Sequence, residues 1–199
     1  MKISEDIAIA VGGNIGNVRT AFQKAIALLK ENGVEKITTS SLYINPAVNC
    51  IPETPDFTNA ALTGKWQRSP HELLSLCQKI ETTLGRPKNN ASSMLEPICL
   101  SESEQKKQSE ESEHNIPCSK HSSTYTSRII DLDIILFGSQ IIDEDDLQIP
   151  HKKAHERLFV LVPLAEIAAE WFFPDKKCNV KGLLNNLKDT YPFQKTNRF

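Results

Sequence analysis

The chain has 199 residues and a formal net charge of −2, with 39% hydrophobic and 24% charged residues, as in a soluble globular domain that buries its own core. The near-neutral charge disfavours a protein that binds the phosphate backbone of duplex nucleic acid, which usually needs a basic excess. No apolar run reaches the roughly 20 residues that span a bilayer, and the acidic start does not resemble a signal peptide, so we expect a cytoplasmic protein that does not bind membranes.

The first third of the chain begins with a strand and a helix. The apolar run 7–11 ends at Gly12-Gly13 and predicts a buried strand. Asn17 has the side chain of an N-cap, and apolar residues at helical spacing follow it as far as Gly33. We therefore expect a helix between these two residues.

Two strands and a second helix follow. Segments 36–45 and 57–66 are rich in β-formers and are separated by a proline-containing loop, which predicts two strands. Ser69-Pro70 indicates a helix start, because Pro suits the first helical position and Glu72 completes a capping box. Gly85 marks the end of this helix.

Segment 88–126 has a different composition. It is rich in Ser and Glu and shows almost no apolar periodicity. Such a segment buries too little surface to offset the entropy lost on ordering. We interpret it as a long disordered insertion within a single domain that spans residues 1–199.

Ordered patterns return after the insertion. Residues 128–137 predict a strand, Gly138 a turn, and Ile149-Pro150 the end of a hairpin-like piece. Helical patterns follow over 154–169 and 180–187. The order β-α-β-β-α-β predicts an α+β fold, a ferredoxin-like sandwich of helices on an antiparallel sheet.

The segment Arg128-Ile-Ile-Asp131-Leu-Asp133 carries the strongest chemical signal. Alternate side chains of a strand share a face, so Asp131 and Asp133 project together, roughly 6–7 Å apart. Two such carboxylates repel each other unless a cation lies between them, and oxygen ligands on a rigid strand suit Mg²⁺. The alternative is an exposed polar edge, but an unpaired carboxylate pair in an otherwise apolar strand is costly.

Four cationic residues accompany this pair: Arg86, Arg128, His151 and Arg157. Arginine offers paired donors that match phosphate oxygens, although each of these residues taken singly is better explained as a partner in a surface ion pair. Together with two acidic metal ligands they supply what phosphoryl-type transfer requires, namely positioning and charge neutralisation.

Two other patterns carry less information. The turn Gly12-Gly13-Asn14-Ile-Gly-Asn17 fits neither a P-loop nor GxGxxG, so we interpret it as a tight strand-to-helix turn that still allows close approach to a ligand. The five cysteines are widely spaced without a CxxC pair, which is no zinc pattern and leaves one thiol over in any disulfide framework. We expect free thiols.

With these residues identified, the chain resembles the 6-hydroxymethyl-7,8-dihydropterin pyrophosphokinase family of folate biosynthesis. The resemblance covers nearly the whole chain outside the insertion and depends on several motifs in one order. These are GGNIGN, SSLYINPAVN with PDFTNAAL, IETTLGR, SRIIDLDIILFG, and IPHKKAHERLFVLVPLAEIA with a later FPD.

The family implies an enzyme that moves the diphosphate of ATP to the hydroxymethyl group of the pterin and releases AMP. Asp131 and Asp133 would then hold two Mg²⁺ ions that bridge the triphosphate. The residues that would contact phosphate or line the nucleotide site are Arg86, Arg128, His151, Arg157, Gln78, Glu81 and Ile134, with Arg86 and Arg128 next to the reacting groups. The family also implies a dihydropteroate synthase as partner, either downstream or fused to the same chain, and both alternatives stay open.

The same resemblance implies a pterin pocket made by one loop, two aromatic rings and one amide. A flat heterocycle suits two aromatic faces, and an amide both donates to and accepts from its polar edge. Without the family, the two aromatic residues are equally well explained as core. The residues are Asn45, Pro46 and Val48 in the loop, the rings of Phe57 and Phe159, and the amide of Asn59.

The sequence departs from the family pattern at several positions. The 88–126 connection, which in the family closes over ATP, is much longer than usual and acidic. Lys88 and Tyr125 stand at nucleotide-contacting positions where Arg and Trp are common. Lys152 follows the histidine in place of Pro or an aromatic residue, and Asn45 replaces a common Thr.

Two other functions compete with this interpretation. A non-catalytic module on the same fold would not need a mutually repelling carboxylate pair. An RNA-binding domain on a ferredoxin-like sheet would need aromatic strands and a basic face, whereas segments 7–11 and 129–137 are mainly aliphatic. We therefore favour the enzyme.

Overall fold

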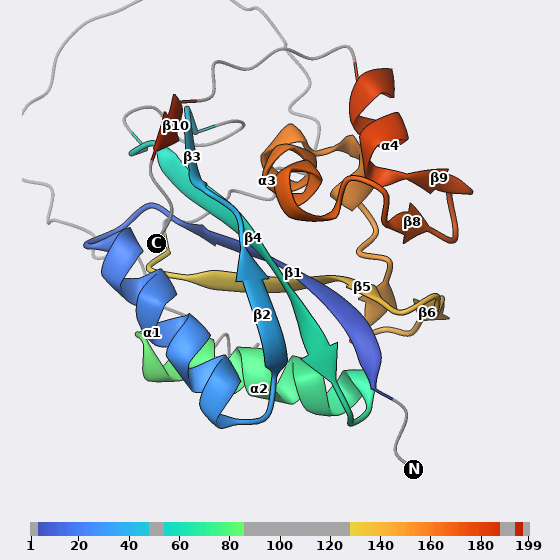
Figure 1. Ribbon diagram of the computed structural model, residues 1–199. Helices are drawn as coiled ribbons and strands as arrows, with labels where there is room; N and C mark the ends of the chain where they lie inside the picture. Colours follow the sequence, from blue (N-terminus) through green and yellow to red (C-terminus); the bar gives the residue numbers. More distant parts are fainter. Residues whose placement is uncertain (1–3, 48–53, 86–127, 188–193, 197–199) are drawn as a thin grey trace, which may run out of the picture.

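A six-stranded antiparallel sheet forms the centre of the structure (Figure 1). The computed structural model describes residues 4–47, 54–85, 128–187 and 194–196. The strands run in the spatial order β10-β3-β4-β1-β5, and β2 pairs with β4 beside this path. Their bounds are β1 (Glu5–Gly13), β2 (Glu35–Thr39), β3 (Leu42–Asn45), β4 (Phe57–Trp66), β5 (Asp131–Phe137) and β10 (Gln194–Thr196).

Helices α1 (Val18–Glu31) and α2 (Pro70–Thr83) cover one face of the sheet. Both begin as the sequence predicted. Asn17 caps α1 by accepting a hydrogen bond from the backbone N–H of Thr20 at 3.0 Å. Ser69 and Glu72 form the reciprocal capping box of α2, in which each side chain accepts from the other residue's backbone N–H.

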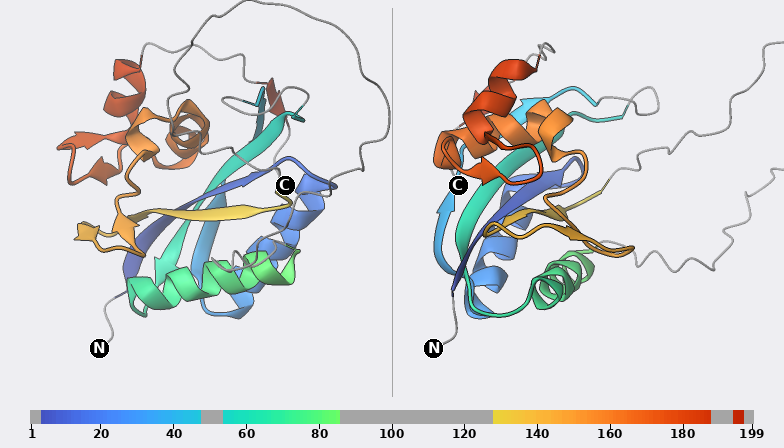
Figure 2. Two further views of the ribbon diagram at one scale, coloured as in Figure 1. Left: turned by 180° about the vertical axis from the view of Figure 1, so that it is seen from behind. Right: turned by 90° about the vertical axis from the view of Figure 1, so that its right-hand side faces the viewer.

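Helices α3 (Leu158–Ala168) and α4 (Val180–Asn186) cover the opposite face, so that the sheet lies between two helical layers (Figure 2). The alternation along β1 explains the two cores. Ile7 and Ile9 pack against α1 and α2, whereas the small Ala8 packs on the side of α3. The expected α+β class with an antiparallel sheet is therefore confirmed.

Several elements differ from the sequence-based boundaries. The single strand expected over 36–45 is divided into β2 and β3, because the Ser40 hydroxyl accepts the Ala61 N–H at 2.9 Å and interrupts the backbone ladder. The helix expected over 154–169 begins as a 3₁₀ turn at Ala154–Glu156, and the extended backbone of Arg157 separates this turn from α3. β5 begins at Asp131, three residues later than expected.

Short strands complete the structure. The hairpin-like piece forms β6 (Ile142–Asp143) and β7 (Gln148–Ile149), as expected. The pair β8 (Phe172–Phe173) and β9 (Cys178–Asn179) and the edge strand β10 were not predicted. No helix in the described part of the chain is long and apolar enough to cross a membrane. The 88–126 segment lies outside the described residues.

Candidate active site

The two aspartates of β5 lie on one face of the sheet. Leu132 and Ile134 point into the core beneath α1 and α2. The intervening side chains of Asp131 and Asp133 therefore project to the opposite face, on the side of α3. β5 ends the strand path and, among the described strands of the sheet, pairs only with β1, so its other edge faces α2 and the segment around His151.

A buried carboxylate fixes that edge of β5. Glu81 on α2 is 5% exposed, and its Oε1 accepts a hydrogen bond from the backbone N–H of Leu132 at 2.7 Å. The bond ties α2 to the strand between its two aspartates. Burial, with Glu81 and Asp133 nearby, raises the pKa of the Cys77 thiol to about 12, so this thiol stays protonated.

Charged groups surround the aspartates. Arg128 Nη1 donates to Asp131 Oδ2 at 2.6 Å, and both side chains are about one-quarter exposed or less. Burial and the charge of Asp131 raise the pKa of the Asp133 carboxyl, while His151, Arg157 and Arg128 act in the opposite direction. The two carboxylates repel each other, and one of them therefore resists ionisation. A divalent cation with oxygen ligands, such as Mg²⁺, would remove this repulsion by binding both.

His151 is held against β5 by its own backbone. Its N–H donates to the carbonyl of Ile135 at 3.1 Å, at the position where the pairing of β5 with β1 shifts by one residue. Its Nδ1 accepts from the Lys153 N–H at 3.3 Å, so in the neutral ring Nε2 carries the proton. Burial and Arg157 lower the pKa of His151, and Asp133 opposes this shift.

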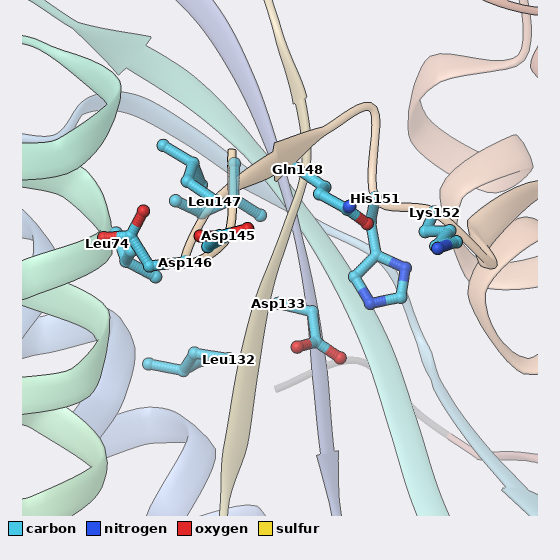
Figure 3. A pocket seen from close by; sticks show the side chains of 10 residues that line it. Leu74, Leu132, Asp133, Asp145, Asp146, Leu147, Gln148, His151 and Lys152 are labelled. Atoms are coloured by element: carbon cyan, nitrogen blue, oxygen red, sulfur yellow. The ribbon is translucent and has the colours of Figure 1, made fainter. Parts of the chain in front are cut away.

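A pocket of about 260 Å³ opens beside Asp133. In Figure 3 the Asp133 carboxylate and the His151 ring point toward one another, and Gln148 lies beside His151. Leu74 of α2 lies on the other side, together with the hairpin residues 145–147. Ile134 and His151 line this pocket, whereas Glu81 lies at the β5 edge and Gln78 is exposed on α2, one turn after Leu74. Its full lining is Leu74, Leu132, Asp133, Ile134, Asp145, Asp146, Leu147, Gln148, His151 and Lys152.

The residues expected around the pterin share the face of the aspartates. Gly12 of β1 pairs with Asn59 of β4 on one side and with Asp131 on the other, which sets Asn59 and Asp131 roughly 10 Å apart. Between them the sheet surface is formed by Gly12, whose Cβ, if present, would lie 3.1 Å from Asn59 Oδ1. This leaves a flat, open floor between the amide and the carboxylates.

Two of the residues expected around the pterin, Asn45 and Asn59, are hydrogen-bonded to each other through their side-chain amides. Asn59 Nδ2 donates to Asn45 Oδ1 at 2.7 Å, and Asn45 Nδ2 donates to the Pro46 carbonyl at 2.9 Å. Phe57 pairs with Asn45 in the sheet and therefore lies on the same face. On α3, the half-buried ring of Phe159 is 5.5 Å from the Arg157 guanidinium carbon, so α3 brings a ring and a cation to this side.

Four of the expected site residues lie outside the described part of the chain: Arg86, Val48, Lys88 and Tyr125. Conversely, the sequence interpretation did not include the pocket-lining residues 145–148, and it named Lys152 only as a departure from the family pattern. For residues 145–148, the available signal was their position in the hairpin segment between the aspartate strand and His151. It also missed Asn14, which contacts Arg128 across the sheet end.

Comparisons with known proteins identify the family of the chain. Residues 8–100 and 89–169 match the family model described as 7,8-dihydro-6-hydroxymethylpterin-pyrophosphokinase (HPPK). The chain is 32% identical over 163 residues to the 2-amino-4-hydroxy-6-hydroxymethyldihydropteridine pyrophosphokinase of Bacillus subtilis, covering 81% of this chain and 77% of that protein. It is also 32% identical over 163 residues to an Arabidopsis thaliana folate synthesis bifunctional protein, covering 82% of this chain and 27% of the relative.

The fold has a solved counterpart as well. A crystal structure of Plasmodium falciparum HPPK-DHPS superposes with a TM-score of 0.63 and 14% sequence identity, covering 93% of this chain and 46% of that one. This likeness concerns the fold alone. The chain spans about a quarter of the length of the bifunctional plant relatives that it matches.

Proposed function

The chain belongs to the 7,8-dihydro-6-hydroxymethylpterin-pyrophosphokinase family, and we propose that it transfers the diphosphate of ATP to the hydroxymethyl group of 6-hydroxymethyl-7,8-dihydropterin, giving the pterin diphosphate and AMP. The observation that supports this most directly is the pair Asp131 and Asp133 on one face of β5, next to three cationic side chains and an open pocket. The reaction would be a step of tetrahydrofolate biosynthesis.

The nucleotide would occupy the pocket between α2 and the β6–β7 hairpin. Leu74 and Leu147 give this pocket an apolar side for a base, and Asp133 and His151 lie at its other side. The triphosphate would then extend toward Arg128 and Arg157, whose guanidinium groups match phosphate oxygens. Arg86, Lys88 and Tyr125 would add contacts, and Gln78 and Glu81 would border the site.

The pterin would lie on the glycine floor of the sheet. Asn59 would bind its polar edge, Asn45, Pro46 and Val48 would border it, and the rings of Phe57 and Phe159 would cover its faces. The roughly 10 Å between Asn59 and Asp131 leaves room for a bicyclic ring whose hydroxymethyl arm points to the aspartates.

In the transfer, the hydroxymethyl oxygen would attack the β-phosphorus of ATP. The new O–P bond forms while the bond from this phosphorus to the oxygen shared with the α-phosphorus breaks. AMP leaves with that oxygen, and the hydroxyl proton is released. Asp131 and Asp133 would hold Mg²⁺, two ions by the family resemblance, and the metal would supply charge neutralisation of the triphosphate. The protein itself orients both substrates and surrounds the phosphates with fixed cations.

We also propose a single domain over residues 1–199, with 88–126 as an insertion. Its unit β1-α1-β2/β3-β4-α2-β5 would be a ferredoxin-like sandwich, which the strand order and the placement of α1 and α2 on one face support. A dihydropteroate synthase would use the product, as a separate protein or as a fused domain. Names such as folate synthesis bifunctional protein among the relatives support the fused form.

The test is AMP release from ATP and Mg²⁺, measured with and without the reduced pterin. We expect AMP to form only when the pterin is present and to fall to background in the Asp131→Asn variant. Asp143→Asn serves as the matched control, because Asp143 is an exposed residue of β6 whose side chain accepts a hydrogen bond from the Gln148 amide, which an asparagine oxygen can also accept. Pterin binding without any pterin-dependent AMP would instead indicate a non-catalytic binding module.

A further inference from the structure

The turn that follows β1 contacts three separate parts of the candidate site. Gly12 lies between Asn59 and Asp131 in the sheet. A Cβ on Gly13 would lie 2.5 Å from the carbonyl oxygen of Ile129, so only glycine allows these two segments of the backbone to approach so closely. Asn14, the next residue, is 8% exposed and contacts both Arg128 and the segment before β4.

Asn14 forms a closed pair of hydrogen bonds with Arg128. The Asn14 backbone N–H donates to the Arg128 carbonyl at 2.9 Å, and the Arg128 backbone N–H donates to Asn14 Oδ1 at 2.8 Å. The β1–β5 pairing itself ends at Gly12 and Asp131. The side chain of Asn14 therefore replaces a strand partner and fixes the backbone three residues beyond the end of the ladder.

This fixed backbone carries the arginine of the site. The Arg128 guanidinium forms the 2.6 Å ion pair with Asp131 and adds to the field at Asp133. Arg128 precedes β5, which begins at Asp131, and both its backbone N–H and its carbonyl are bonded to Asn14. Asn14 therefore helps to fix the backbone from which the guanidinium extends to Asp131.

The same amide reaches the pterin side. Asn14 Nδ2 donates to the carbonyl of Pro55 at 3.4 Å, a long hydrogen bond, and Pro55 stands two residues before Phe57 at the start of β4. One side chain therefore contacts the segment that presents the arginine and the segment that leads into Phe57 and Asn59. Figure 1 shows the turn between β1 and α1 next to the start of β5.

We propose that Asn14 is a positioning residue that holds the phosphate side and the pterin side of the site in one alignment. Its acceptor oxygen places Arg128 against the aspartates, and its amide group places the segment at Pro55. This inference rests on the proposed function, because the alignment matters only when a phosphoryl group must pass between the two substrates.

The turn offers a matched control in Asn17. Both residues are asparagines of the same turn, and both use Oδ1 to accept a backbone N–H, but the partner of Asn17 is Thr20 within α1. Asn17→Ala therefore loses a helix cap without a change at Arg128. Asn17→Asp keeps the cap and adds one negative charge to the same turn, which controls for the charge of Asn14→Asp.

The experiment measures kcat and both KM values of pterin-dependent AMP formation in the two pairs of variants, together with their melting temperatures. A misplacement of a positioned group by about 1 Å costs on the order of 100-fold in rate. We expect Asn14→Ala to lose roughly 10- to 100-fold in kcat, and Asn17→Ala to keep its kcat within about twofold at a similar loss of melting temperature.

Asn14→Asp separates the two contacts, because its carboxylate still accepts from the Arg128 N–H but cannot donate to Pro55. We expect it to regain most of the kcat lost in Asn14→Ala and to raise the KM of the pterin more than that of ATP, relative to Asn17→Asp. Equal kinetics in the Asn14 and Asn17 variants would overturn the positioning role. A wild-type protein without pterin-dependent AMP would overturn the proposed function, and this inference with it.

Discussion

At the scale of a single residue, the buried carboxyl of Asp133 links the stability of the protein to pH. The carboxyl lies beside Asp131 in an otherwise apolar strand, and burial with this neighbouring charge raises its pKa above the ordinary value of 3.8. The folded metal-free protein therefore holds the Asp133 proton more tightly than the unfolded chain does. By linkage, the stability that this proton provides is complete at low pH and is lost as the pH rises through the raised pKa.

In the Asp133→Asn variant, the side-chain amide has nearly the shape of the protonated carboxyl and carries no charge. We expect Asp133→Asn to stabilise the metal-free protein at pH 7, by roughly 1 kcal/mol, because it removes a charge for which burial and the repulsion from Asp131 outweigh the attraction of His151, Arg157 and Arg128. The same variant should lose pterin-dependent turnover and the stabilisation that Mg²⁺ gives to the wild type. Urea unfolding at pH 5 and pH 7, with and without Mg²⁺, measures these effects.

The exposed Asp143 again provides the control, since its replacement by Asn removes an equal charge without burial. A metal-free Asp133→Asn variant that is less stable than wild type at pH 7 would contradict the assigned strain. Equal Mg²⁺ stabilisation in both proteins would show that Asp133 is not a metal ligand.

At the scale of elements, Glu166 anchors α3 to the sheet. Its side chain is 13% exposed, and it accepts from the Ser41 N–H, the Ser41 hydroxyl and the Tyr43 hydroxyl, each at 2.9 Å. Lys195 of β10 approaches it at 3.5 Å. Since Phe159 lies in the first turn of α3 and β3 ends at Asn45, this anchor would set the distance between two parts of the proposed pterin pocket.

We expect Glu166→Gln to destabilise the protein by about 1–3 kcal/mol, because the new NH₂ group faces donors that then lack an acceptor. The KM of the pterin should rise while the KM of ATP changes little. Thermal unfolding and steady-state kinetics test this. Glu170→Gln is the control, because Glu170 stands just beyond the same helix, is exposed and accepts a hydrogen bond from the exposed Asn179 amide rather than from the sheet. Similar losses in both variants would argue against a specific anchor.

The elements also show what the sequence could and could not predict. Local rules sufficed where neighbouring residues decide the structure, as in the cap of Asn17, the capping box of Ser69 and the common face of Asp131 and Asp133. They failed at Ser40, where a side-chain oxygen takes a ladder position from a strand 21 residues away.

The same limit applied to the site. Asn14 and Arg128 are 114 residues apart, and no periodicity or motif within either segment indicates their pairing. Glu81 contacts Leu132 across 51 residues in the same way. Contacts of this kind follow from the packing of whole elements, so the residue types were visible in the sequence while their partners were not.

At the scale of the molecule, the sheet separates a structural core from a functional face. Beneath α1 and α2 the face is apolar, whereas the opposite face combines the α3 core with Asn59, Gly12 and the aspartates in neighbouring rows. The family match consists of two pieces, 8–100 and 89–169, which overlap within the 88–126 segment between α2 and β5. This division supports the proposed insertion at that place in the chain.

This division predicts the result of removing the added residues. We expect deletion of residues 91–122 to change the melting temperature by no more than about 2 °C, because a Ser- and Glu-rich segment contributes little apolar burial.

The segment is acidic and continues directly to Arg128, so its deletion should lower the KM of ATP at low ionic strength. This difference should disappear near 0.5 M salt, where exposed charges are screened beyond roughly 4–5 Å. A large fall in melting temperature would show that the segment packs against the domain, and a salt-independent KM would exclude an electrostatic effect.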